Sequence, residues 1–530
     1  MWGRRWRGAL ACALATAAAA GCSDSDRSAQ DVEHLVVIYQ ENKSFDVYFG
    51  IYPSAANPPG QPVFRAKPDT PRVNGLTDML LFDNPNEANP FRIDRTQSYT
   101  CDQSHDYTTE QQSRNGGAMD RFVQFDAEPP TNPRQFCTET ASGQWDTLMG
   151  YFDGNTVTAL WNYAQHFVIG DDFFASNFGE STRGALNLAV GSTYGVVCGE
   201  SGHVYGDVPE CGGPVDSTTI AAPTNGNVGT LNVDTDPYWD VCGGGYGLAA
   251  FTGRNVGDLL NDAGVTWGWF QGGFTLDASG QCTSSHPLEA YDRATGVDPA
   301  TDPLRFVDYV PHHNPFQYFA STANPWHLPP TSVDMVGKSD QANHLYDLSW
   351  FWPAAEAGNL PTVSFLKPPA YQNGHPGNST PLDEQVFLVE TLNRLQALPE
   401  WRSMVVIVAW DDSDGWYDHV SPPIVNRSAT PLDFLCGDVT DGPGARCGYG
   451  PRLPFVVVSP FAKQNHVSHD VMDQASILRF IEDRWVGGER ISETSFDRLS
   501  GSIADVFDFA GAPAPKLFLD PDTGTVRSGA

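Results

Sequence analysis

The stretch HLVVIYQENKSFDVYFG, residues 34–50, contains the pattern that decides the fold. Its first part, residues 34–39, is an almost continuous apolar run, and a second such run, MVVIVAW, covers residues 404–410. Continuous apolar runs, rather than alternating ones, are typical of strands buried on both faces of a parallel sheet. Shorter runs at 361–366 and 454–458 predict two further strands of this kind. We therefore expect a mostly parallel central sheet.

Helical patterns lie between the predicted strands. In residues 471–485, Ile477, Phe480 and Ile481 fall on one face with helical spacing, and the Ser-His-Asp sequence at 468–470 is expected to cap this helix. Strands that alternate with helices predict a layered α/β domain.

The domain is expected to span residues 33–511, after a linker at 22–32 and before a C-terminal tail at 512–530. Within it, residues 196–301 are rich in Gly and Cys and show little periodicity. This part is predicted to be a disulfide-tied, loop-rich insertion or cap.

The composition excludes some classes of function. The chain has 530 residues, with 31 Lys+Arg against 64 Asp+Glu and a formal charge of −33. Binding nucleic acid requires clustered cations, so nucleic acid is not expected as a partner. Hydrophobic residues make up 40% of the chain, which excludes wholesale disorder and supplies a large core.

The first 21 residues have the pattern of an export signal. Arg4, Arg5 and Arg7 precede an apolar stretch at residues 8–20, which is too short to span a bilayer as a helix. The sequence AAGC at 19–22 is similar to a lipoprotein cleavage box, so Cys22 is a candidate for lipidation, with ordinary cleavage nearby as the alternative. The mature protein is expected in the periplasm, anchored to the envelope by a lipid, or secreted.

Eight cysteines remain after the signal, and an even number in an exported protein predicts disulfides. Close spacing favours Cys198–Cys211 and Cys436–Cys447, which leaves Cys101–Cys137 and Cys242–Cys282 as the remaining pairs. A zinc site is not expected, because the sequence has no C-x-x-C pair.

Acidic and amide side chains follow both long apolar runs. Glu41-Asn42 comes after the first and Asp411-Asp412 after the second. Ligands of α/β sheets bind at the carboxyl ends of strands, and these oxygens suit a divalent cation. Neighbours on a strand point to opposite faces, so both members of a pair reach one ion only if the strand breaks there. The alternative is that these acids cap loops or helices.

A candidate nucleophile lies in FGESTRG, residues 178–184, just before the helical stretch 185–190. A hydroxyl at a helix N-terminus is well placed to hold a phosphate, but serine is also a common N-cap. Several of the 13 histidines lie in loops, where they can bind a metal, contact phosphate or transfer protons. These are His105, His312, His313, His375 and His419.

Residues 41–50, ENKSFDVYFG, resemble the E-N-[RK]-S-F-D-x-Y-F-G signature of the bacterial phosphoesterase family that contains phospholipases C and acid phosphatases, relatives of alkaline phosphatase. Other motifs resemble those of the family in the same order, from about residue 33 to 507. They lie at residues 115–120, 313–316, 367–369 with 375–377, 418–423 and 478–482.

The resemblance implies an alkaline-phosphatase-like core that binds one divalent metal ion. Its ligands would be Glu41, Asn42, Asp411, Asp412 and the nucleophile Ser181. His105, His313 and His375 would surround the phosphoryl group, with His312 a weaker candidate.

The nucleophile loop departs from the family pattern G-P-[ST]-x-P, because Glu180 and Arg183 replace the two prolines. Thr182 therefore stays an alternative to Ser181, although Ser181 keeps the family spacing. Arg183 is expected either to contact phosphate or, in preference, to be solvated.

The implied activity is hydrolysis of phosphate esters through a phosphoserine intermediate. The Asp411-Asp412 doublet is closer to the acid phosphatases, so we expect a phosphomonoesterase with an acid optimum. The alternatives are a phospholipase C that cleaves phosphodiesters and, less favoured, a binding protein without turnover. The sequence does not indicate the oligomeric state.

Overall fold

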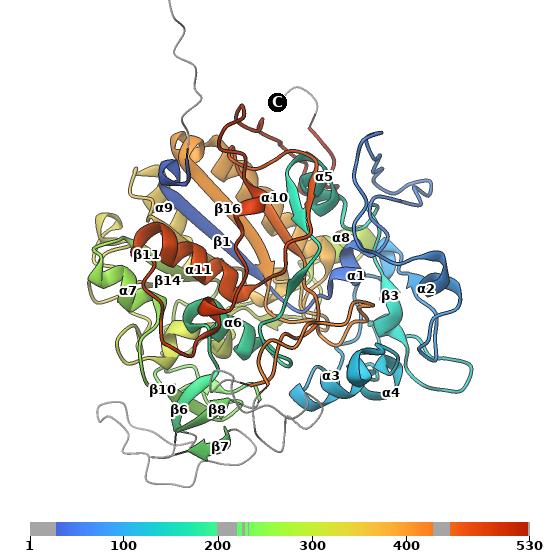
Figure 1. The fold of residues 1–530 in the computed structure, drawn as a ribbon, viewed down its shortest axis with the longest axis horizontal. Coiled ribbons are helices and arrows are strands. Elements are labelled where there is room, and N and C mark those ends of the chain that lie inside the picture. The colour runs from blue at the N-terminus through green and yellow to red at the C-terminus, as the bar shows by residue number, and fades with distance from the viewer. Residues whose placement is uncertain (1–27, 199–219, 225–227, 232, 428–445, 528–530) are drawn as a thin grey trace, which may run out of the picture.

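The computed structural model describes residues 28–198, 220–224, 228–231, 233–427 and 446–527. Its centre is an eight-stranded sheet with the strand order β14-β11-β15-β1-β16-β17-β4-β18. The two long apolar runs form β1 (His34–Gln40) and β16 (Met404–Trp410), which are parallel neighbours near the middle of the sheet (Figure 1). The whole of β16 is buried. The prediction of a mixed α/β fold with a mostly parallel sheet is confirmed.

The sheet continues in parallel on the β1 side, where the third predicted strand forms β15. On the other side, β17 runs antiparallel to both of its neighbours, so the prediction of a parallel strand at 454–458 is wrong. A strand covered on both faces is apolar throughout whatever its direction, so the run itself does not reveal that direction. The remaining strands of this sheet are β14 (Leu345–Asp347), β11 (Trp267–Gln271), β15 (Val363–Lys367), β17 (Phe455–Val458), β4 (Val168–Gly170) and β18 (His466–Ser468).

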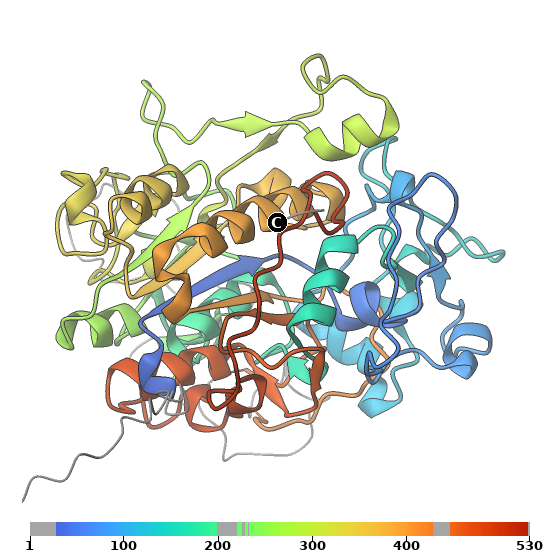
Figure 2. The same ribbon diagram turned by 90° about the horizontal axis from the view of Figure 1, so that it is seen from above.

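Helices cover both faces of the sheet. Seen from above, α10 (Pro381–Ala397) lies on one side, and α6 (Ser181–Val190) and α11 (Gln474–Trp485) lie on the other (Figure 2). The other α-helices are α1 (Phe45–Phe49), α2 (Asp78–Phe82), α3 (Tyr107–Arg114), α4 (Phe122–Phe125), α5 (Thr158–His166), α7 (Val256–Asp262), α8 (Glu289–Thr295) and α9 (Phe351–Glu356).

Helix α11 begins later than the sequence predicted. Asp473 is its N-cap and forms a capping box with Ser476, whereas Ser468 ends strand β18. The capping prediction at 468–470 is therefore wrong, because the stronger reciprocal cap lies closer to the apolar helical stretch.

A smaller five-stranded sheet lies at one end of the molecule and is labelled in the lower part of Figure 1. It falls within or next to the range 196–301 that was predicted to be an insertion, but the same range also supplies β11 to the central sheet. Its strands are β7 (Ile220–Thr224), β8 (Val228–Leu231), β6 (Tyr194–Cys198), β10 (Leu248–Phe251) and β9 (Asp236–Pro237).

Three two-stranded ribbons complete the described strands. One of them leads into α8, which lies against α10 through a 2.6 Å hydrogen bond from the Ala290 amide to Asp383 Oδ1 (Figure 2). The ribbons are β12 (Ser285–His286) with β13 (Phe306–Val307), β19 (Met472–Asp473) with β5 (Phe173–Phe174), and β2 (Phe91–Arg92) with β3 (Gly150–Tyr151).

Two disulfides join described residues, Cys101–Cys137 and Cys242–Cys282. They are the two pairs that spacing favoured least. Cys447 is also disulfide-bonded, while Cys211 and Cys436 lie outside the described residues.

The two ends of the described chain pack against the domain. Val32, in the predicted linker, is fully buried, and Leu517 and Leu519 of the predicted tail are buried beside α10. Gln396 and Asn393 of α10 each donate a 2.8 Å hydrogen bond to the carbonyl oxygens of these two leucines.

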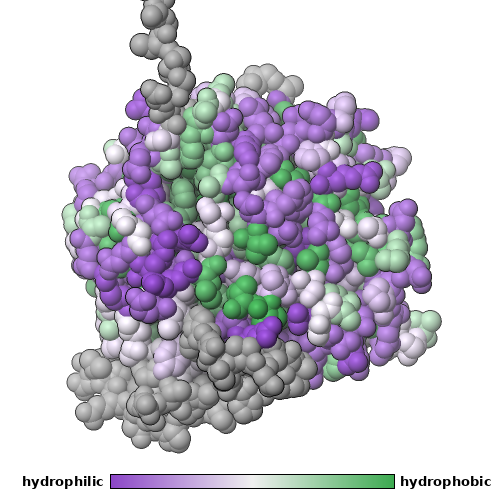
Figure 3. Space-filling model, viewed as in Figure 1, coloured by the Kyte–Doolittle hydropathy of each residue, from purple (hydrophilic) through white to green (hydrophobic). Residues whose placement is uncertain are grey.

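The face shown in Figure 3 is mostly hydrophilic, with apolar patches near its centre. Within the described ranges, we find no helix with both the length and the apolar character needed to cross a bilayer.

Candidate active site

The candidate site lies at the carboxyl ends of the two central strands. Glu41 comes directly after β1, and Asp411 and Asp412 come directly after β16. Asn42 has a left-handed backbone with φ of 51°, which breaks the extended path after Glu41. This break lets Glu41 and Asn42 both face the same point, as a shared ligand site requires.

That point is the hydroxyl of Ser181, the first residue of α6. Ser181 Oγ lies 3.2 Å from Glu41 Oε2, 3.3 Å from Asn42 Oδ1 and 2.7 Å from Asp412 Oδ2. The N-cap of α6 is Glu180, and Ser181 Oγ is directed at the acids, so Ser181 is not the helix cap. Four oxygen atoms from three distant parts of the chain therefore converge in a buried space.

Helix α6 is held close to the end of β16 by a glycine. A Cβ atom on Gly184 would lie 2.2 Å from the carbonyl oxygen of Asp411, too close for any side chain. This contact fixes the first turn of α6 against the acidic residues that follow β16.

Asp411 makes different contacts from Asp412. Its Oδ1 accepts hydrogen bonds from the backbone amides of Asn42 at 3.1 Å and Asp412 at 2.9 Å. Its Oδ2 lies 3.1 Å from Lys367 Nζ, and the same lysine forms an ion pair with Glu41. Lys367 belongs to the motif at 367–369, but nothing in that motif indicates that its side chain lies among the acids.

The donor set fits a divalent cation. Glu41, Asp411 and Asp412 are all buried, and Lys367 forms ion pairs with Glu41 and Asp411. Burial and the charge of Glu41 raise the pKa of Asp411 to about 8, and burial also raises the pKa of Asp412 to about 7. Carboxylate, amide and hydroxyl oxygens are ligands that hard divalent cations prefer, and such a cation would compensate the excess negative charge.

A prediction on stability follows. Without a cation, the folded chain holds the Asp411 and Asp412 protons to a higher pH than the unfolded chain, where the pKa is about 3.9. Between about pH 4 and pH 8 the folded state therefore binds more protons, and the free energy of unfolding falls as pH rises. Calorimetry on chelated and Mn²⁺-loaded protein should show a larger stabilisation by metal at about pH 8 than at about pH 5. Equal stabilisation at both pH values would contradict this assignment.

The three predicted histidines line one pocket of about 800 Å³ beside Ser181. His313 Nδ1 lies 2.9 Å from Glu41 Oε1, and His105 Nε2 lies 3.3 Å from Asn42 Nδ2. The rings of His105 and His375 are 6.4 Å apart. The structure thus brings the predicted histidines close to Ser181, the candidate nucleophile.

The pKa values of two of these histidines are shifted in opposite directions. Burial lowers the pKa of His105, but the charges of Asp412 and Asp414 raise it by more than burial lowers it. The net result is a pKa well above the ordinary value. Burial and Lys367 place the pKa of His313 well below its ordinary value. His105 is therefore suited to carry a proton near neutral pH, and His313 to stay neutral.

His312 also lines the pocket but is paired with two acids, with its ring nitrogens 3.3 Å from Asp234 Oδ2 and Asp236 Oδ1. Although burial lowers its pKa, these carboxylates raise the pKa of His312 to about 9.

Arg183 is buried between Tyr107 and the Gly179 backbone, so the expectation that it is solvated is wrong.

Two positioning residues were missed by sequence reasoning. Asp414 Oδ1 accepts a 3.1 Å hydrogen bond from Asn42 Nδ2, which turns the Asn42 oxygen toward Ser181. Glu110 of α3 accepts 2.5 Å hydrogen bonds from the Gly179 amide and from Ser413 Oγ, and so joins the two loops of the site. Asp414 lies two residues beyond the predicted pair Asp411-Asp412, whereas nothing in the sequence around Glu110 signals this role.

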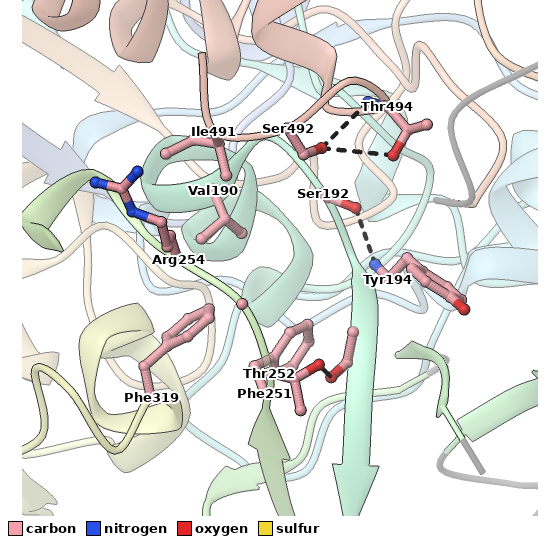
Figure 4. Close-up of a pocket in the computed structure, with 12 residues that line it drawn as sticks. Val190, Ser192, Tyr194, Phe251, Thr252, Arg254, Phe319, Ile491, Ser492 and Thr494 are labelled. Atoms are coloured by element: carbon pink, nitrogen blue, oxygen red, sulfur yellow. Dashed lines mark hydrogen bonds between the residues drawn. The ribbon is translucent and has the colours of Figure 1, made fainter. Parts of the chain in front are cut away.

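A second pocket of about 280 Å³ lies at the other end of α6, next to Val190 (Figure 4). Phe251, Phe319 and Ile491 give it apolar walls, and Arg254 lies at its side. None of the twelve residues that line it is a carboxylate or a histidine, so it lacks the groups for phosphoryl chemistry.

Residues 32–486 match the model of the Phosphoesterase family, so the chain belongs to that family. It is 25% identical over 513 residues to the non-hemolytic phospholipase C of Pseudomonas aeruginosa, with 93% of this chain and 60% of that protein covered. It is also 25% identical over 502 residues to phospholipase C B of Mycobacterium tuberculosis, with 92% and 79% covered. A 133-residue part is 26% identical to non-specific phospholipase C6 of Arabidopsis thaliana, covering 23% of this chain and 24% of that protein. The chain thus spans 60% of the length of the Pseudomonas relative.

Proposed function

We propose that this chain is a metal-dependent phosphodiesterase of the phospholipase C type with an alkaline-phosphatase-like core. The observation that carries the proposal is the convergence of Glu41, Asn42 and Asp412 on the buried hydroxyl of Ser181. The names of the relatives support phospholipids as substrates. Export through residues 1–21 and lipidation at Cys22 belong to the same proposal.

One divalent cation would be held by Glu41, Asn42, Asp411, Asp412 and Ser181, where it supplies charge neutralisation and lowers the pKa of the serine hydroxyl. Ser181 Oγ attacks phosphorus, and the diacylglycerol alkoxide leaves. Water then cleaves the phosphoserine ester, releasing the phosphorylated headgroup and restoring the serine.

Side chains around Ser181 have distinct parts in these steps. Because the acids raise its pKa, His105 can carry the proton that the leaving alkoxide takes up. The positive end of the α6 dipole at Ser181 stabilises the negative phosphoryl oxygens. Lys367 holds Glu41 and Asp411 in place through its ion pairs.

Acidic side chains at one part of the pocket favour a zwitterionic diester over a monoester dianion. Asp102, Glu180 and Asp234 line the pocket together with the histidines. Glu180 is next to the nucleophile, in a position where the family pattern has proline. Burial and the charge of Asp234 raise the pKa of Glu180 to about 8, so Glu180 is a carboxylate above that pH. As a carboxylate it attracts a cationic headgroup such as choline and repels the second negative charge of a phosphomonoester. The acid phosphatase activity implied by the Asp411-Asp412 doublet is the second candidate.

The test compares two soluble substrates, p-nitrophenylphosphorylcholine and p-nitrophenyl phosphate, with metal-loaded protein. At about pH 9, where Glu180 is ionised, we expect kcat/KM to be at least about tenfold higher for the choline diester, and Glu180→Gln to reduce that preference. Asp308→Asn, which alters a buried acid outside this pocket, is the matched control. A clear preference for p-nitrophenyl phosphate would support the acid phosphatase, and no turnover of either substrate would contradict both activities.

A further inference from the structure

Exposed apolar side chains are concentrated in one part of the chain. Among the described residues, twelve large apolar side chains are exposed, and five of these lie between positions 246 and 328. Tyr246 is 64% exposed, Val307 51%, Trp326 51% and Leu328 41%. Single exposed apolar residues are ordinary, so the question is whether these four share one surface.

Three contacts gather their loops around the Cys242–Cys282 disulfide. The loop that carries Tyr246 begins at this disulfide. The Val241 amide donates a 3.1 Å hydrogen bond to the carbonyl oxygen of Pro325, the residue before Trp326. Cys282 Sγ lies 3.6 Å from a ring nitrogen of His327, the residue between Trp326 and Leu328.

Val307 joins the same region from strand β13. It pairs with Ser285, which lies three residues beyond Cys282. Tyr246 and Val307 both line the pocket beside Ser181, and the Tyr246 ring is 5.2 Å from that of His312. Tyr246 and Val307 thus line the pocket, and Trp326 and Leu328 lie on a loop held at the disulfide from which the Tyr246 loop begins. We call these four exposed side chains the apolar rim.

We propose that the apolar rim is the surface by which the protein docks on a zwitterionic phospholipid bilayer. This inference rests on the proposed function, because a lipid substrate must leave its bilayer to reach the buried Ser181. Tyr and Trp are the side chains that favour the membrane interface, where one end is apolar and the other is wet.

The charge of the chain selects the type of bilayer. With a formal charge of −33, the protein is repelled by an anionic lipid surface, and a neutral zwitterionic surface carries no such penalty. Docking by the rim would also bring the pocket mouth directly over a headgroup.

The test measures sedimentation with phosphatidylcholine vesicles, in the Ser181→Ala background so that the vesicles are not hydrolysed. The variant Trp326→Ser/Leu328→Ser should lower vesicle binding about tenfold or more, because two apolar side chains no longer enter the interface. In the active protein the same pair of changes should lower turnover of vesicles and leave turnover of soluble p-nitrophenylphosphorylcholine within about twofold. That soluble activity also shows that the variant is folded, and each single substitution should give part of the loss.

The matched control is Met79→Ser/Phe82→Ser, which removes from α2 two apolar side chains that are even more exposed, at 67% and 76%. It should leave vesicle binding unchanged. Binding that is equally strong in the rim variant, or equally reduced in the control, would overturn the proposal. A wild type that cleaves no choline ester but still binds vesicles through the rim would reject the proposed function and leave the docking surface standing.

Discussion

Replacing Ser181 by alanine is expected to abolish the proposed phosphodiester hydrolysis, with a loss of at least about 10⁴-fold in kcat. The reason is that Ser181 Oγ is the hydroxyl on which Glu41, Asn42 and Asp412 converge. Folding should be unaffected, because the lost hydroxyl contacts acids rather than the apolar core. Steady-state kinetics and thermal unfolding of the purified variant measure both effects.

A covalent trap decides between the two neighbouring hydroxyls. Acid quenching during turnover, followed by peptide mass mapping, should find the phosphoryl adduct on Ser181. The control is Thr182→Val, which removes the adjacent hydroxyl and should keep the adduct. An adduct on Thr182, or full activity in Ser181→Ala, would contradict the assignment of the nucleophile.

Replacing Asp412 by asparagine should weaken metal binding by about a hundredfold or more, since it removes a charge from the proposed hard-cation site. Asp412 Oδ2 lies 2.7 Å from Ser181 Oγ, whereas Asp411 Oδ2 is engaged by Lys367. We therefore expect Asp411→Asn to have the smaller effect on affinity. Titration calorimetry with Mn²⁺ and metal analysis after dialysis measure the difference.

The control for this pair is again Asp308→Asn, a buried acid that contacts His286 away from the candidate site. It should bind metal as the unmodified protein does. Unchanged affinity in both Asp411→Asn and Asp412→Asn would leave these two residues without a role as ligands.

The sequence was informative where one local pattern determines the structure. The runs that became β1 and β16 are long and apolar, so their burial on both faces could be predicted. The direction of β17 could not, because it depends on the path of the preceding chain rather than on the apolar residues of the strand. The predicted start of α11 was too early, because two plausible caps, at Ser468 and Asp473, lie five residues apart and the structure uses Asp473.

For the candidate site, the residues at strand ends could be predicted because the topology of α/β sheets brings those ends together. Contacts made by single side chains across the fold could not. Glu110 reaches Gly179 and Ser413 from a helix with no motif, and Lys367 joins Glu41 to Asp411 across the sheet.

The left-handed backbone at Asn42 restricts which amino acids natural variation or directed evolution can place there. With φ of 51°, the position is open to glycine, asparagine and aspartate, while most other residues would be strained. Glycine has no oxygen to offer Ser181, and aspartate would add another negative charge beside Glu41, Asp411 and Asp412. It would also lose the amide hydrogen that Asp414 accepts. Backbone shape and charge together leave asparagine as the one residue that meets all of these demands, so a screen of all twenty amino acids at position 42 should recover almost nothing else.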